Sequence, residues 1–243
     1  MARKTKPIVS ITGMSTPRGG ALPGAGVRGF DRLMAIQRPA VLAHIRGIRK
    51  RNPDASSREL IRILERRYLA AVTTSGAAVG ATAVIPAIGT VTTVALSGVE
   101  TAAFLEATAL FAQSVSEVHG VAVDDPDRAR ALVMALMLGR EGSDLVRQWG
   151  AEAIARDTTR QVYWGEVVTS SLPRAVVGPL VDQLKKSFLR RFAVKGGAGM
   201  LAKAIPFGIG AVVGGTGNHL LGRRVLGNAR IAFGEPPIVV IEH

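Results

Sequence analysis

The chain has 243 residues, which suits one large domain, and 47% of them are hydrophobic, enough for a substantial core. It contains no Cys, which excludes disulfides and thiolate sites, and its 5% aromatic content predicts a core built mainly from Ala, Val, Leu and Ile. The net charge of +13 is uneven, because residues 1–68 carry +11 and the rest of the chain only +2. This asymmetry indicates either an anionic partner, lipid head groups or nucleic acid, or a solubilising basic tail.

The first residues predict a flexible basic arm. Residues 1–29 mix Lys and Arg with Ser, Thr, Gly and Pro and show little periodicity. They lack the continuous apolar segment of a secretory signal, so we expect a cytoplasmic N-terminus. The expected organisation is a basic arm at 1–29, a single α-helical domain at 30–234 and a C-terminal tail at 235–243.

Two helices with basic residues are expected after the arm. Pro39 suits the first turn of a helix that runs to about residue 51. Ser56 and Glu59 form a capping box that starts a second helix. Basic residues crowd the end of the first helix and are candidate contacts for anionic lipids: Arg46, Arg49, Lys50 and Arg51.

A run of 31 residues at 69–99 contains no Asp, Glu, Lys, Arg or His. About 20 apolar residues span a bilayer, so the length permits a transmembrane segment. However, only ten of the 31 are Leu, Ile or Val, and Pro86 and Gly89 divide the run into two short pieces. We therefore expect a helical hairpin that inserts shallowly or is buried in protein, with a fully inserted, pore-like protein as the alternative.

The second half predicts more helices and no convincing strand, so the expected fold class is all-α, a multi-helix bundle. Asp125 is placed to cap a helix that Pro126 opens, and Ser143–Asp144 to cap the next one. Residues 173–194 have an apolar stripe at helical spacing. Basic residues on or beside its other face form a second set of candidate lipid contacts: Lys185, Lys186, Arg190 and Arg191.

The stretch KAIPFGIGAVVGGTGNH at 203–219 is rich in glycine but does not match a nucleotide-binding loop, since its glycine spacing is one residue too long and no strand precedes it. Glycines four residues apart lie on one helix face and allow a second helix to approach closely. The stretch also resembles AVIPAIGTV at 83–91, where Ile-Pro again precedes an apolar helix. The residues that we expect to serve helix packing are Gly76, Gly80, Pro86, Pro206, Gly210, Gly214 and Asn218.

Three polar residues stand among apolar neighbours and are candidates for burial: Glu100, Glu106 and His219. A buried carboxylate is costly without a partner, and Asn218 and His219 are placed to form hydrogen bonds between helices. No metal-ligand spacing, nucleophile motif or cofactor fingerprint is found, so no catalytic, metal or cofactor site is predicted. A soluble lipid-binding protein or hydrolase with these three residues around an apolar cavity remains an alternative.

Two stretches resemble the EcsC family of bacterial proteins, named after the third member of an operon that also encodes an ABC transporter. They are IPAIG with the helix that ends in HGVAVDDPDRAR, and IPFGIGAVVGGTGN with the following RRVLGNA. The resemblance covers about residues 60–232 and supplies no catalytic residues. It implies an α-helical, membrane-associated protein.

The expected function is therefore that of a non-enzymatic accessory or regulatory protein at the inner face of the cell membrane. Its expected partners are anionic lipids and a membrane protein or transporter. Nucleic-acid binding is not expected, because it would rest on charge alone.

Overall fold

The computed structural model describes residues 38–82, 90–151, 163–195 and 210–236, and these residues form helices without a strand among them. The expected all-α class is confirmed. The basic arm at 1–29, Pro86, Pro206 and most of the C-terminal tail lie outside the described residues. In chain order the elements are α2 (Arg38–Arg49), α3 (Ser57–Thr82), α4 (Thr90–Val118), α5 (Pro126–Leu138), α6 (Arg140–Trp149), α8 (Trp164–Glu166), the π-helical turn η1 (Val167–Ser171), α9 (Arg174–Lys195) and α10 (Gly210–Phe233).

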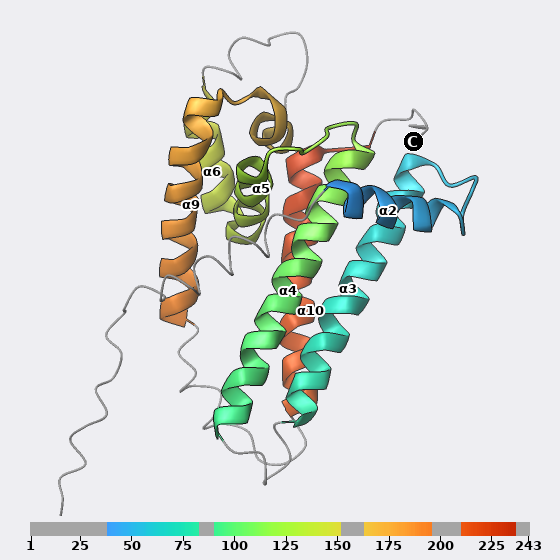
Figure 1. The fold of residues 1–243 in the computed structure, drawn as a ribbon, viewed down its shortest axis with the longest axis vertical. Coiled ribbons are helices and arrows are strands. Elements are labelled where there is room, and N and C mark those ends of the chain that lie inside the picture. Colours follow the sequence, from blue (N-terminus) through green and yellow to red (C-terminus); the bar gives the residue numbers. More distant parts are fainter. Residues whose placement is uncertain (1–37, 83–89, 152–162, 196–209, 237–243) are drawn as a thin grey trace, which may run out of the picture.

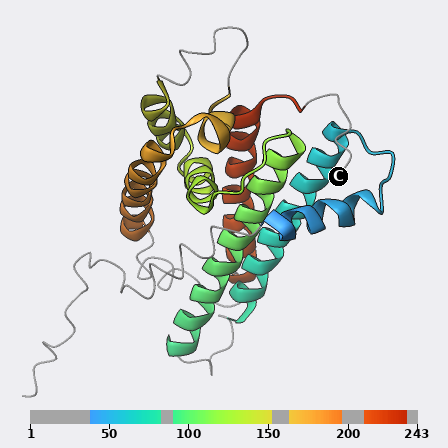
Figure 2. The ribbon, with the colours of Figure 1, turned by 45° about the horizontal axis from the view of Figure 1, so that its top comes forward.

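Three long helices, α3, α4 and α10, form the main bundle (Figure 1). The closest pair is α3 and α10, which pack side by side although they lie far apart in the sequence. At one end of the bundle, α2 crosses α4 and α3, and α5, α6 and α9 form a second group of helices beside it (Figures 1 and 2). The other end of the bundle consists of the uncharged second half of α3, the start of α4 and the start of α10.

Helix α5 joins the two groups, because it contacts α9 and α6 on one side and α4 and α10 on the other. Its run from Ala131 to Leu136 is almost fully buried, so it is apolar on all sides, as expected for a central helix. The Asp125 carboxylate caps it by accepting from the backbone N–H groups of Asp127 and Arg128 at 2.8 and 3.3 Å, as the sequence predicts.

The start of α3 also agrees with the sequence. The Glu59 carboxylate accepts from the Ser56 backbone N–H at 2.8 Å, and the Ser56 hydroxyl accepts from the Glu59 N–H at 3.3 Å. Further along α3, the Tyr68 ring stacks on Phe111 of α4 at a centroid distance of 4.7 Å. Burial raises the pKa of the Tyr68 phenol, and its hydroxyl is hydrogen-bonded to that of Thr108 at 2.9 Å.

The prediction that Ser143–Asp144 caps a helix is wrong. Helix α6 begins at Arg140, and the Ser143 hydroxyl donates to the Arg140 carbonyl from inside the helix. The chain turns instead at Gly139, which has φ +67° and whose N–H donates to the Ala135 carbonyl at the end of α5. Because Gly139 is the N-cap of α6, Ser143 and Asp144 lie inside the helix and do not cap it.

The sequence analysis also left open whether the uncharged run at 69–99 spans a membrane. Within the described helices, none combines the length and the apolarity that crossing a bilayer would require.

Candidate functional site

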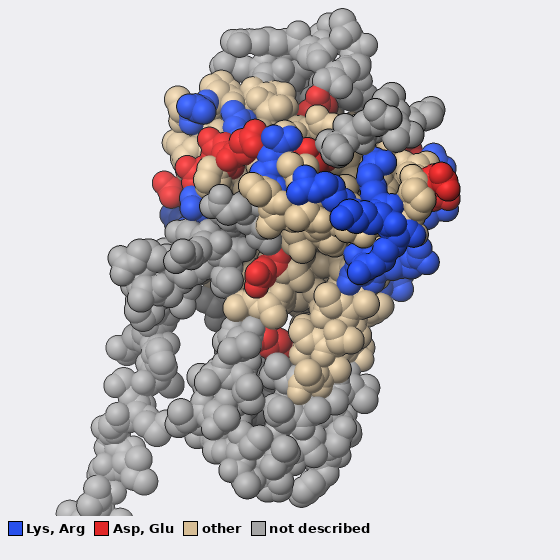
Figure 3. Space-filling model, turned by 45° about the vertical axis from the view of Figure 1, so that its right-hand side comes forward, with Lys and Arg blue, Asp and Glu red and all other residues tan. Residues whose placement is uncertain are grey.

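A basic surface covers α2, the turn after it and the exposed face of α3 (Figure 3). It contains three of the four lipid-contact candidates from this region as exposed residues, and the fourth, Arg49, as a partly buried one. The surface continues along α3 through three arginines that are four residues apart, because residues at this spacing share a helix face. We call the following set the α2–α3 basic surface: Arg46, Arg49, Lys50, Arg51, Arg58, Arg62 and Arg66.

Few carboxylates neutralise this surface. Asp54 and Glu59 are exposed within it, and the Glu59 carboxylate is already bound to the amide and hydroxyl of Ser56. These hydrogen bonds lower the pKa of Glu59, with Arg62 contributing in the same direction. The surface therefore keeps a strong positive charge at neutral pH.

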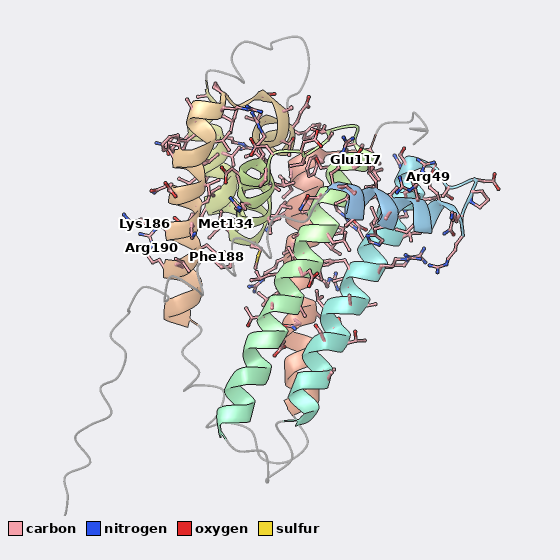
Figure 4. All side chains as sticks on the ribbon, viewed as in Figure 1. Arg49, Glu117, Met134, Lys186, Phe188 and Arg190 are labelled. Atoms are coloured by element: carbon pink, nitrogen blue, oxygen red, sulfur yellow. The ribbon has the colours of Figure 1, made fainter. Side chains whose placement is uncertain are left out.

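The second set of lipid-contact candidates lies elsewhere. Lys186 and Arg190 project from the outer side of α9, on the opposite side of the helical array from Arg49 on α2 (Figure 4). Arg190 also forms an ion pair with Glu141 of α6 at 3.5 Å, and Lys185 is partly buried. The side chain of Arg191 lies outside the described residues. The structure therefore does not bring the two predicted basic sets into one surface.

The other face of α9 is apolar and points inward. Phe188 is buried and lies on the side of α9 that faces α5 and its buried Met134 (Figure 4). The amphipathic pattern of 173–194 thus predicts the orientation of this helix correctly.

Asn218 and His219 of α10 make the two polar contacts between helices that the sequence suggested. The Asn218 amide donates to the Glu100 carboxylate of α4 at 3.0 Å. The Nδ1 atom of His219 lies 3.1 Å from the Thr73 hydroxyl of α3. These two neighbours on α10 therefore connect it to both other long helices.

The expectation for the carboxylates is right for one residue and wrong for another. Glu100 is partly buried, and this burial raises its pKa, although the hydrogen bond from Asn218 opposes the shift. Glu106 is exposed, so it is not a buried polar residue. Six positions along a helix leave two side chains about 120° apart around the axis, which explains why these two carboxylates differ in exposure. Glu100, Glu106 and His219 do not line a common buried site.

Glycines do allow close packing, but the structure demonstrates it at positions other than the predicted pairs. Gly76 is buried on α3, whereas Gly80, Gly210 and Gly214 lie in parts of the helices whose packing is not described. On α10, a Cβ added at Gly222 would lie 3.0 Å from Val72 Cγ2, and one added at Gly215 would lie 3.2 Å from the Ala77 Cβ. These two glycines are seven residues apart, which also places them on one face of a helix.

Among the ion pairs that the sequence analysis missed are two whose carboxylates are buried. The Arg230 guanidinium of α10 donates both Nε and Nη2 to the Glu65 carboxylate of α3, each at 2.7 Å. The Arg38 guanidinium binds Glu117 in the same way at 3.2 and 2.9 Å, holding the start of α2 on the end of α4. Both carboxylates are buried, and their partners are 165 and 79 residues away, a separation that no local pattern reveals.

An open groove of about 680 Å³ lies beside the Glu65–Arg230 pair, between α3, α6, α8 and the end of α10. Its polar lining includes four arginines, which come from three different helices: Arg58, Arg62, Arg147 and Arg230. Two aromatic residues, Tyr163 and Trp164, and two isoleucines, Ile61 and Ile231, also line it. The sequence analysis did not single out this group, although the arginines on α3 at spacing four were visible in it.

The described parts of the chain contain no cluster of three or more His, Asp or Glu side chains that could hold a metal ion.

No family model, no curated protein and no solved structure matches the chain.

Proposed function

We propose that this protein binds the surface of anionic membranes through the α2–α3 basic surface and acts there as an accessory or regulatory factor. The observation that supports this proposal is a surface of seven basic side chains, six of them exposed and Arg49 partly buried, with few acids between them. Each Lys or Arg near an anionic bilayer contributes about 1 kcal/mol of attraction. A few such contacts acting together are enough for reversible attachment.

The resemblance to the EcsC family supports the same proposal, because that family is membrane-associated. The proposed location is the cytoplasmic face of the membrane, where anionic lipids are concentrated. A transporter or another membrane protein is the partner that the resemblance suggests.

Sedimentation with lipid vesicles tests the proposal. The full chain is mixed with vesicles of phosphatidylcholine, with or without phosphatidylserine, at physiological and at high salt. We expect binding to the anionic vesicles alone and a loss of binding as salt screens the charges. The triple variant Arg46→Gln, Lys50→Gln, Arg51→Gln removes three charges, equivalent to about 3 kcal/mol, or roughly a 100-fold weaker vesicle affinity.

The matched control is the double variant Lys186→Gln, Arg190→Gln on the opposite side of the molecule, which we expect to bind as the unmodified chain does. Equal binding to neutral and anionic vesicles would refute the proposal. So would a triple variant at Arg46, Lys50 and Arg51 that binds no more weakly than the α9 control.

A further inference from the structure

We propose that the groove between α3, α6, α8 and the end of α10 is a binding site for a phosphate-bearing ligand, held by Arg62 and Arg147. This site shares Arg58 and Arg62 with the α2–α3 basic surface, but it also includes Arg147 of α6 and binds one discrete ligand rather than attracting a membrane diffusely. It does not depend on that function, and it would take a discrete ligand whether the ligand is free in solution or part of a lipid head group.

The arginines of the groove fall into two kinds. Arg230 is bound by the buried Glu65 carboxylate, and Arg58 forms an ion pair with Glu235 at 2.8 Å. Arg62 and Arg147 are exposed and have neither a hydrogen bond nor an ion pair with any residue that the structure describes. The two acids balance two of the arginines, so the lining keeps a net charge of +2. This positive charge can balance the charge of about −2 on a phosphate monoester.

Arg62 has like charges on both sides along α3, and Glu59, whose carboxylate is bound to Ser56, interacts electrostatically with it. Arg62 stands four residues after Arg58 and four before Arg66 on α3, and like charges at this spacing destabilise a helix by about 0.2–0.5 kcal/mol for each pair. A bound phosphate removes this repulsion. Guanidinium groups are suited to the task, because their planar N–H groups bind phosphate oxygens in pairs.

A second observation, independent of charge, also indicates a ligand. Trp164 lines the groove and is only 3% exposed, yet its indole N–H has no acceptor among the described residues. A buried donor without a partner costs free energy and is uncommon in native proteins. This N–H is itself buried, so an oxygen of a bound ligand would supply the missing acceptor once the side chains around it shift on binding.

The groove is larger than a phosphate ion, and its remaining wall is apolar. Its volume of about 680 Å³ falls in the range typical of small-molecule sites. The isoleucine Ile231 is 62% exposed on this wall, close to Tyr163 and Ile61. We therefore infer a ligand with a phosphate at one end and an apolar or ring-shaped part at the other.

Fluorescence titration tests this inference. The chain has two tryptophans, so the Trp149→Phe variant leaves Trp164 as its only reporter. This variant is titrated with inorganic phosphate and with phenyl phosphate, and with chloride at matched ionic strength as the control. We expect a saturable change in Trp164 fluorescence with both phosphates, tighter for phenyl phosphate, and no change with chloride.

Substitution of the two free arginines gives the decisive comparison. In the same Trp149→Phe background, Arg62→Ala and Arg147→Ala are each expected to weaken phosphate binding by about 10- to 100-fold, as for the loss of a charged hydrogen bond. Because both side chains are exposed and form no hydrogen bond or ion pair with the described residues, the variants should fold normally. The triple variant Arg46→Gln, Lys50→Gln, Arg51→Gln should bind phosphate unchanged, because its substitutions lie outside the groove, and this separates the site from the part of the basic surface at the end of α2.

A vesicle experiment identifies the source of the phosphate. Vesicles with phosphatidic acid are compared with phosphatidylserine vesicles of equal surface charge. Tighter binding to phosphatidic acid that is lost in the Arg62→Ala, Arg147→Ala double variant supports a lipid head group as the ligand, and phosphate binding without this preference supports a free ligand. Absence of any saturable response to phosphate, or a double variant that binds phosphate as tightly as its parent, would overturn the inference.

Discussion

Gly142 is the position where the packing of the helices can be tested most directly. This residue of α6 faces the end of α5, and a Cβ built on it would lie 2.4 Å from the carbonyl oxygen of Ala135 and 2.6 Å from its Cα. Ordinary contacts of a Cβ begin near 3.4 Å. Both opposing atoms belong to the backbone, so no side chain can rotate away, and α6 would have to move by about 1 Å.

The expected cost follows from this geometry. Overpacking a well-packed interior costs about 1–3 kcal/mol, and we expect about 2–3 kcal/mol here because the opposing atoms are backbone. The gain of up to about 1 kcal/mol from replacing a helical glycine by alanine leaves a net cost of about 1–2 kcal/mol. In a protein of this size 1 kcal/mol corresponds to about 2–4 °C in Tm. We therefore expect Gly142→Ala to lower the Tm by about 2–8 °C, measured by far-UV circular dichroism.

The matched control is Gly227→Ala on the exposed face of α10, where an added Cβ would have no neighbour within 4 Å. Here only the gain in helix propensity applies, so the Tm should rise by up to about 4 °C. A Gly142→Ala variant that melts at or above the temperature of the unmodified chain would show that α5 and α6 do not approach as closely as described.

Two further predictions concern pH. Burial lowers the pKa of His119, so the folded state favours the neutral imidazole. This preference stabilises the fold above the unfolded pKa of about 6.5, and the stabilisation is lost as the pH falls through the lower pKa of the folded state. Thermal melts of the unmodified chain should therefore show a decrease in Tm from about pH 7 to pH 5, and His119→Phe should weaken this dependence; an unchanged slope would contradict the assignment. Burial raises the pKa of Glu100, so the folded state disfavours the charged carboxylate that is present at neutral pH. The Glu100→Gln variant keeps an acceptor for Asn218 and should melt at a higher temperature than the unmodified chain at pH 7, but not near pH 4. Asn218→Leu at pH 7 should have the opposite effect, because it removes the partner of the Glu100 carboxylate.

Local patterns in the sequence predicted local structure well. The capping box at Ser56 and the Asp125 cap depend on side chains within three residues of the backbone groups that they bind, so the sequence contains all the information needed. The apolar stripe of α9 likewise identifies the buried face of that helix, because helical periodicity alone decides which residues share a face. The all-α class follows from the sum of such signals.

The candidate sites were only partly predictable, for reasons of distance. The sequence marked Asn218 and His219 as polar residues on an apolar helix, but it did not identify Glu100 and Thr73 as their partners, 118 and 146 residues away. The sequence analysis predicted burial for both Glu100 and Glu106, although the orientation of α4 in the bundle leaves Glu100 partly buried and Glu106 exposed. The two sets of basic residues, near α2 and on α9, could be identified in the sequence. Their location on opposite sides of the molecule could not be predicted from it.

By itself, then, the sequence determined the helical class, the ends of several helices and the unequal distribution of charge along the chain. These properties depend on interactions within a few residues or on composition. Only the tertiary structure decided which side chains meet: the buried Glu65 and its partner Arg230, the close approach of α10 to α3 at Gly222, and the groove that Arg62 and Arg147 line together. The physical reason is that these contacts join helices distant in sequence, and the packing of their apolar faces sets the rotation and height at which each side chain arrives.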